Sequence, residues 1–255
     1  MIRVKKTCEI DVRRLEANTG EGTHMVNFQV LNNGNIAMIF ETPGKKGNEL
    51  RYTIKIHTRL GIQRQCSFTA IESRLENVIL YMNELYAIMS EGEKLTINRL
   101  EPETKENLFP LKEGKIHQVI GLSRNSLMIA YEDGSVAEYT EGNENIVQKA
   151  GDRASLSLDF NRRYMVAAGS TITRFDERGI KTYETECSSI EGFLLARGDR
   201  AFAVCSNGRF TEYSKEGDMF AKKDDIVDMD VRACSMVKDT AALYDGDMIC
   251  MYKLM

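Results

Sequence analysis

The chain has 255 residues and a formal net charge of −4, and 42% of its residues are hydrophobic and 28% charged. This composition excludes a disordered chain, because it supplies enough apolar side chains to bury a core. No apolar run approaches the roughly 18 residues of a membrane-spanning helix, and the opening MIRVKKTCEI is charged where a signal peptide is apolar. We therefore expect a protein of the cytoplasm or nucleus that contacts no membrane.

The N-terminal part predicts a strand, a loop and then a series of strands. Residues 2–12 alternate apolar and polar side chains, which indicates a strand. Residues 13–23, RRLEANTGEGT, are expected to form a crossover loop. The runs VNFQVL, IAMIFE, RYTIKI and QRQCSF that follow predict four consecutive strands within residues 24–68.

Residues 69–90 permit two interpretations. Ile71, Leu75, Val78 and Met82 recur in steps of four and three, which is typical of an amphipathic helix. The run VILYM and the repeat that follows it are typical of strands, and consistency with that repeat favours strands here. A helix remains the alternative.

A repeat of about 40 residues covers the rest of the chain. Similar apolar runs, from LYAIMSEG to AALYDG, end in turn glycines whose spacings are 42, 35, 39 and 38 residues. These are Gly92, Gly134, Gly169, Gly208 and Gly246. Each repeat contains four short strands separated by tight turns, and such a unit is typical of one blade of a β-propeller. The blades are expected at about 24–68, 69–110, 111–150, 151–186, 187–224 and 225–255.

In strand order the chain resembles β-propellers of the WD-repeat type over nearly its whole length. The segments EYTEG, RFDERG and EYSKEG stand where those proteins carry their Trp-Asp dipeptide, but this chain has no Trp and no Gly-His dipeptide. We expect an all-β, six-bladed β-propeller of four-stranded antiparallel blades in one domain, closed by pairing of the N-terminal strand with the last blade. The resemblance implies a rigid scaffold that displays loops to protein partners.

The sequence offers little catalytic chemistry. It has no nucleophile, phosphate-binding, dinucleotide-binding or zinc-protease motif, and its six cysteines form no Cys-x-x-Cys pair or metal-spaced cluster, so we expect reduced thiols and neither metal nor cofactor. His24, His57 and His117 would have to converge on the axis to make a hydrolase site. The Asp224–Asp230 cluster lacks the glycine and final Glu of a calcium loop, and Arg197-Gly198-Asp199 is expected to be a tight turn.

A set of basic residues is the strongest candidate site in the sequence. They fall in the turns between the first and second strands of the last four repeats, which a propeller places on one face. The set, called here the basic crescent, comprises Arg124, Arg162, Arg163, Arg197, Arg200 and Lys238. Because arginine matches carboxylate and phosphate geometry, an acidic protein segment or a nucleic-acid backbone is the expected partner.

We expect a non-catalytic interaction scaffold, a subunit that binds other protein subunits in a larger complex. A propeller that docks nucleic acid through the basic crescent and a propeller hydrolase with its site at the channel mouth are the alternatives.

Overall fold

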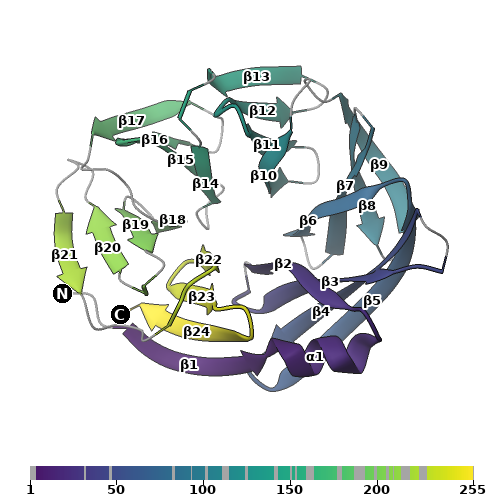
Figure 1. The fold of residues 1–255 in the computed structure, drawn as a ribbon. Coiled ribbons are helices and arrows are strands. Elements are labelled where there is room, and N and C mark those ends of the chain that lie inside the picture. The colour runs from purple at the N-terminus through teal and green to yellow at the C-terminus, as the bar shows by residue number, and fades with distance from the viewer. Residues whose placement is uncertain are drawn as a thin grey trace. The chain divides into compact units, whose positions relative to one another are not determined.

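The computed structural model describes most of the chain (Figure 1). The residues that it does not describe are 1–3, 32, 46–47, 82–83, 93, 101–102, 111–114, 124–125, 141–142, 150, 153, 159–163, 177–179, 187–192, 198–199, 205–206, 209, 214–218, 224–228 and 255. The chain divides into two compact units, one formed by residues 1–12 with 150–255 and the other by residues 13–149. None of the helices among the described residues has the length and apolarity needed to cross a bilayer.

The unit of residues 13–149 contains three antiparallel sheets, each made of four consecutive strands in sequence order. The first sheet has strands β2 (His24–Val30), β3 (Ile36–Pro43), β4 (Glu49–Thr58) and β5 (Gly61–Ile71). The second has β6 (Arg74–Tyr81), β7 (Glu84–Glu91), β8 (Lys94–Leu100) and β9 (Glu103–Pro110). The third has β10 (Ile116–Ser123), β11 (Ser126–Tyr131), β12 (Val136–Thr140) and β13 (Asn143–Gln148).

The other unit contains two further sheets of four consecutive strands and one composite sheet. The consecutive sheets are β14 (Ala154–Leu158), β15 (Tyr164–Ala168), β16 (Thr171–Phe175) and β17 (Lys181–Glu186), then β18 (Phe193–Arg197), β19 (Arg200–Val204), β20 (Phe210–Tyr213) and β21 (Met219–Lys223). The composite sheet joins β22 (Ala233–Val237), β23 (Thr240–Tyr244) and β24 (Met248–Leu254) to β1 (Val4–Asp11), which pairs antiparallel with β24.

This topology corrects the expected count of six blades. Five blades are made of four consecutive strands, whereas the C-terminal segment supplies only three strands, β22 to β24, and becomes a four-stranded sheet by adding β1 from the other end of the chain. In this composite sheet β1 takes the place beside β24 that the fourth strand of the repeat takes in the other sheets.

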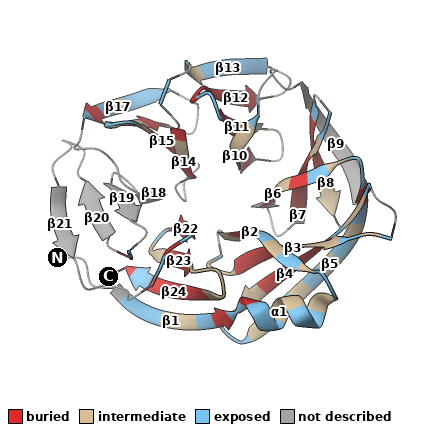
Figure 2. Cartoon of the chain, in the orientation of Figure 1, coloured by how far each residue is buried: buried red, intermediate tan, exposed pale blue. Residues whose placement is uncertain are grey.

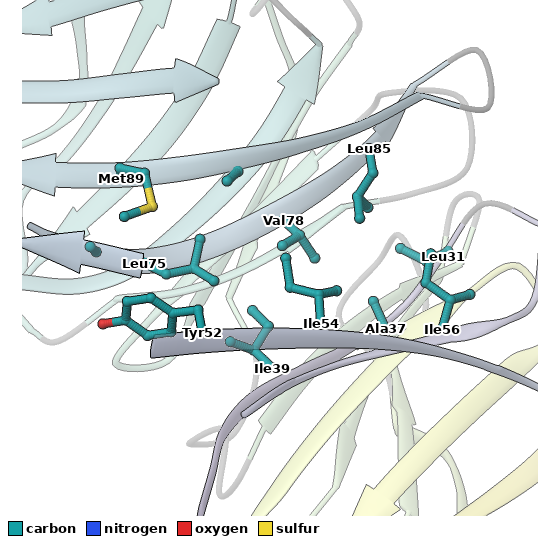
Figure 3. Close-up of a cluster of buried hydrophobic side chains, with 12 residues drawn as sticks. Leu31, Ala37, Ile39, Tyr52, Ile54, Ile56, Leu75, Val78, Leu85 and Met89 are labelled. Carbon is teal, nitrogen blue, oxygen red and sulfur yellow. The ribbon is translucent and has the colours of Figure 1, made fainter. Parts of the chain in front are cut away.

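Apart from residues 82–83, which are not described, the segment 69–90 lies in β5, β6, β7 and the turn between β5 and β6, as the favoured interpretation predicted, and a β-bulge explains why its spacing is typical of a helix. The register of β6 against β7 shifts between Leu75 and Asn77. The extra residue of the bulge lets Leu75 and Val78, three positions apart, both join one buried cluster. Leu85 and Met89 of β7 lie in the same cluster, which packs between the first two sheets (Figure 3).

The expected crossover loop at residues 13–23 is wrong, because Val12–Thr19 forms the helix α1. Its sequence holds good helix formers and is followed by Gly20. Eight residues are too few for a stable isolated helix, so tertiary contacts must hold α1 in place. One such contact is the Glu16 carboxylate, which accepts a hydrogen bond from the Met25 backbone N–H at 2.7 Å.

The buried Lys55 of β4 holds the C-terminal end of α1. Its ammonium donates to Thr19 Oγ1 at 2.5 Å and to the Leu15 carbonyl at 3.3 Å, and it lies 5.1 Å from the centre of the Phe40 ring. A cation at a helix C-terminus is favourable because the last carbonyls are partly negative. Burial nevertheless lowers the pKa of Lys55 below its usual value, since the low-polarity surroundings penalise the charged form.

We expect Lys55 to make the free energy of unfolding increase with pH in the alkaline range. Because its pKa is lowered on folding, the unfolded chain holds the proton more tightly, and the free energy of unfolding rises with pH up to the ordinary lysine pKa. Denaturant unfolding between pH 7 and pH 10 checks this. The difference in unfolding free energy between wild type and Lys55→Met should increase with pH, and a flat or falling difference would contradict it.

The described residues include three clusters of buried hydrophobic side chains, and buried positions lie along the strands of several sheets (Figure 2). One cluster joins the first and second sheets, a second joins the second and third, and a third lies within the composite sheet. Amide side chains add polar links between first strands in the unit of residues 13–149. Asn27 of β2 donates to the Glu76 carbonyl at 3.2 Å, and Asn77 of β6 donates to the Val119 carbonyl of β10 at 2.7 Å.

Candidate interaction surface

Half of the basic crescent lies outside the described residues. Arg124, Arg162 and Arg163 are among those not described. Arg197 ends β18 and Arg200 begins β19, where the two are paired in register, and Lys238 is exposed in the turn between β22 and β23 with a φ of +57°. The neighbouring Asp239 forms an ion pair with Lys253 at 3.2 Å. The crescent stays a prediction.

The β4–β5 hairpin, residues 49–71, exposes aliphatic side chains that are not among the site residues predicted from the sequence. Leu60, at the hairpin turn, is 99% exposed, and Ile62, two residues later, is 45% exposed. Ile71, at the other end of β5, is 68% exposed. Single exposed aliphatic residues are common on protein surfaces, so the feature that distinguishes this turn is that it carries two of them, two residues apart.

The turn that carries Leu60 is held in one conformation. The Thr58 hydroxyl accepts a hydrogen bond from the Leu60 backbone N–H at 3.1 Å and donates to the Gly61 carbonyl at 3.2 Å. Gly61 has a φ of +119°, which L-residues with a side chain rarely adopt. The hairpin therefore presents Leu60 and Ile62 on a preorganised turn.

One face of β5 is anchored in the protein core. Cys66 and Phe68 pack against the cluster between the first two sheets, and Ala70 is one of its buried members. The Phe68 ring lies 5.6 Å from the buried Tyr52 ring. Burial raises the pKa of Tyr52 to about 12, so this phenol is neutral at physiological pH. This packing fixes the position of β5 along its length.

The other face of β5 is exposed and nearly uncharged. Gln63, Gln65, Ser67 and Thr69 are all exposed, and the Ser67 hydroxyl forms a 3.0 Å hydrogen bond with the hydroxyl of Thr53 in β4. Only Arg64 is charged among the eleven residues of β5. A strand with this alternation has one face that packs on the core and one face that is exposed to solvent.

The three histidines, the candidates for a hydrolase site, are all among the described residues. In the part of the chain that the structure describes, no three His, Cys, Asp or Glu side chains are grouped to hold a metal ion. His24 lies 3.7 Å from the Glu41 carboxylate, and burial lowers the pKa of His57. Cys234 and Cys250 are free thiols whose pKa is raised by burial, so they are protonated at neutral pH. The Asp224–Asp230 cluster and the Arg197-Gly198-Asp199 turn lie largely among the residues not described.

A signal for the hairpin surface was present in the sequence. The run GIQRQCSFTAI predicts a long strand with one charged residue, whereas protected outer strands carry several charges. What hid the site was the position of β5 at the end of its sheet, which strand patterns alone do not give.

No protein-family model and no curated protein sequence matches the chain. Solved structures are similar in fold. A catalytically inactive variant of virginiamycin B lyase from Staphylococcus aureus, crystallised with quinupristin, has a TM-score of 0.62 at 11% identity and is covered in full by a match to the whole of this chain. Hsv2 from Kluyveromyces marxianus has a TM-score of 0.54 at 10% identity, with 87% of this chain and 89% of that chain covered.

The BBS1N structure, determined in complex with ARL6DN, has a TM-score of 0.54 at 11% identity, with 92% of this chain and 91% of that chain covered. At such low identity these likenesses show the fold and nothing finer. The chain is a β-propeller protein.

Proposed function

We propose that this protein is a non-catalytic interaction scaffold, a subunit of an intracellular complex in the cytoplasm or nucleus, and that it holds a partner protein at the β4–β5 hairpin. The observation that carries the proposal is the exposure of Leu60 and Ile62 on a turn that its own hydrogen bonds fix. A rigid turn loses little conformational entropy when a partner covers it, so apolar contact there stabilises a complex efficiently.

The solved structures of similar fold bear on the proposal in two ways. The structure of BBS1N was determined with a protein partner, ARL6DN, so a chain of similar fold serves as a binding module. Virginiamycin B lyase shows that a similar fold also supports catalysis, and a catalytic role is therefore the alternative to this proposal.

Quantitative affinity purification tests the proposed function. Tagged wild type is compared with Leu60→Asp/Ile62→Asp, and we expect the captured partners to fall at least about tenfold because a buried apolar contact is replaced by carboxylates. The matched control is Ile146→Asp/Ile180→Asp, which changes two other exposed isoleucines, 55% and 57% exposed.

The control should keep the partners, and circular dichroism should show that both variants fold. Equal capture by the Leu60→Asp/Ile62→Asp variant and wild type would overturn the proposal. Loss of all partners after nuclease treatment would also overturn it, in favour of nucleic-acid binding.

A further inference from the structure

We propose that the outer edge of β5 accepts an extended segment of the partner protein as an added strand, with carboxylates at the segment's end that lies beside Arg59 and Arg64. This inference rests on the proposed function and names the chemistry of its partner. It concerns the backbone edge of the strand, whereas the proposed function concerns the apolar turn.

The first support is the position and length of β5. It is the outermost strand of its sheet, and within the described part of the chain it pairs with β4 alone. Its eleven residues make it the longest of the strands that the structure describes. An edge strand exposes alternate backbone N–H and C=O groups, which are a template for pairing with another chain.

The second support is that the other sheets protect their outer strands and this one does not. Charged side chains make up four of eight residues in β1, three of eight in β9, three of six in β17 and two of five in β21. β13 has one in six and is short, and β9 ends in Pro110. β5 has one charge in eleven residues and no proline. Charges, proline and short length are the usual means of preventing edge pairing, so their absence from β5 marks an edge that is kept available.

The third support is that β5 is rigid before any partner arrives. Its inner face is fixed by Cys66, Phe68 and Ala70 in the core, and Thr53 and Ser67 join it to β4 across the outer face. Because the strand is already formed, only the partner's segment loses conformational entropy on binding. The exposed Gln63, Gln65 and Thr69 side chains can then take cross-strand neighbours without burying a charge.

The charges around the two ends of β5 set the chemistry of the segment and its direction. Arg59 and Arg64 lie at the Gly61 end, whereas at the other end Glu49 and Glu72 are balanced by two exposed arginines, Arg51, paired in register with Thr69, and Arg74. Carboxylates on the added segment are therefore attracted to the first end. A second copy of this chain fits less well, because antiparallel pairing would bring its Ile71 end to these arginines, and the carboxylates of that end are balanced by its own arginines.

The test begins with a phage-displayed library of random twelve-residue peptides selected on the wild-type protein. We expect the recovered peptides to be rich in β-branched residues, with Asp or Glu clustered at one end. The strongest binder is then synthesised with a fluorescent label, and its affinity is measured by fluorescence anisotropy for wild type and two variants.

The Arg59→Glu/Arg64→Glu variant should bind the peptide at least roughly tenfold more weakly, because attraction becomes repulsion. The matched control, Lys94→Glu/Lys115→Glu, makes the same charge change at two exposed lysines of the same unit and should bind as wild type does. The peptide is also N-methylated either at its odd-numbered or at its even-numbered residues. One of these two peptides should lose binding and the other should keep it, since the backbone N–H groups of only one set point toward β5.

Peptides without acidic enrichment, equal binding to Arg59→Glu/Arg64→Glu, or equal tolerance of both N-methylation sets would each overturn the inference. Self-association of the wild type that Arg59→Glu/Arg64→Glu changes would overturn it in favour of a homodimer. The proposed function fails separately, when Leu60→Asp/Ile62→Asp keeps its partners. In one further outcome, Leu60→Asp/Ile62→Asp loses its partners and the peptides give one of the contradicting results named first. In that case the turn is the contact with the partner, and the edge of β5 is not.

Discussion

Deleting residues 1–11 is expected to lower the free energy of unfolding by more than about 4 kcal/mol, because truncation of a single buried isoleucine already costs about 2–5 kcal/mol. The deletion removes Ile10, which is 3% exposed, and strips β24 of its partner from Val4 to Asp11. Ile249, Cys250 and Met251 of β24 are buried and would then lie on an open sheet edge. Denaturant unfolding monitored by circular dichroism measures the loss.

Adding the missing strand back provides the control. A synthetic peptide of residues 1–12 should restore the unfolding midpoint of the deleted protein in a concentration-dependent way, because a ligand that binds only the folded state stabilises it by mass action. A peptide of the same composition in scrambled order should not. Unchanged stability of the deletion variant, or equal rescue by both peptides, would show that β1 contributes little.

Replacing Asn77 with alanine is expected to cost about 2–4 kcal/mol, since each buried polar group left without its partner costs about 1–3 kcal/mol. Asn77 is 8% exposed, and its amide group makes two contacts. The Nδ2 group donates to the Val119 carbonyl at 2.7 Å, and Oδ1 accepts from the Val78 backbone N–H at 2.8 Å. Alanine removes both hydrogen bonds. The bond to Val119 links β6 to β10, and the bond to Val78 stabilises the bulge.

The matched control is Asn145→Ala, which changes an exposed asparagine of β13 and should alter the free energy of unfolding by less than about 0.5 kcal/mol. Asn27→Ala should fall between the two, because Asn27 makes the same pair of contacts, to Glu76 and Phe28, at a less buried position. If Asn77→Ala and Asn145→Ala unfold at the same denaturant concentration, the amide links carry no stability.

The linking asparagines could be recognised in the sequence only after their strands were known. Asparagine is disfavoured in strands, so Asn27 in VNFQV and Asn77 in ENVIL stand out at equivalent places in two repeats. Their role depends on a bulge, which falls between Met25 and Asn27 and again between Leu75 and Asn77. A bulge shifts the pattern of buried residues by one, and for that reason residues 69–90 have the spacing of a helix although they form strands.

The sequence by itself determined the repeat, the strand order and the propeller fold, because short-range alternation of apolar residues and turn glycines acts within each group of four strands. Tertiary structure alone decided the features that depend on distant partners. The helix α1 exists because Lys55 and Met25 hold it, and the composite sheet exists because β1 meets β24 from the opposite end of the chain. The availability of β5 likewise follows from its place at the end of a sheet, since a strand's own residues specify its faces but not which neighbour, if any, pairs with its edge.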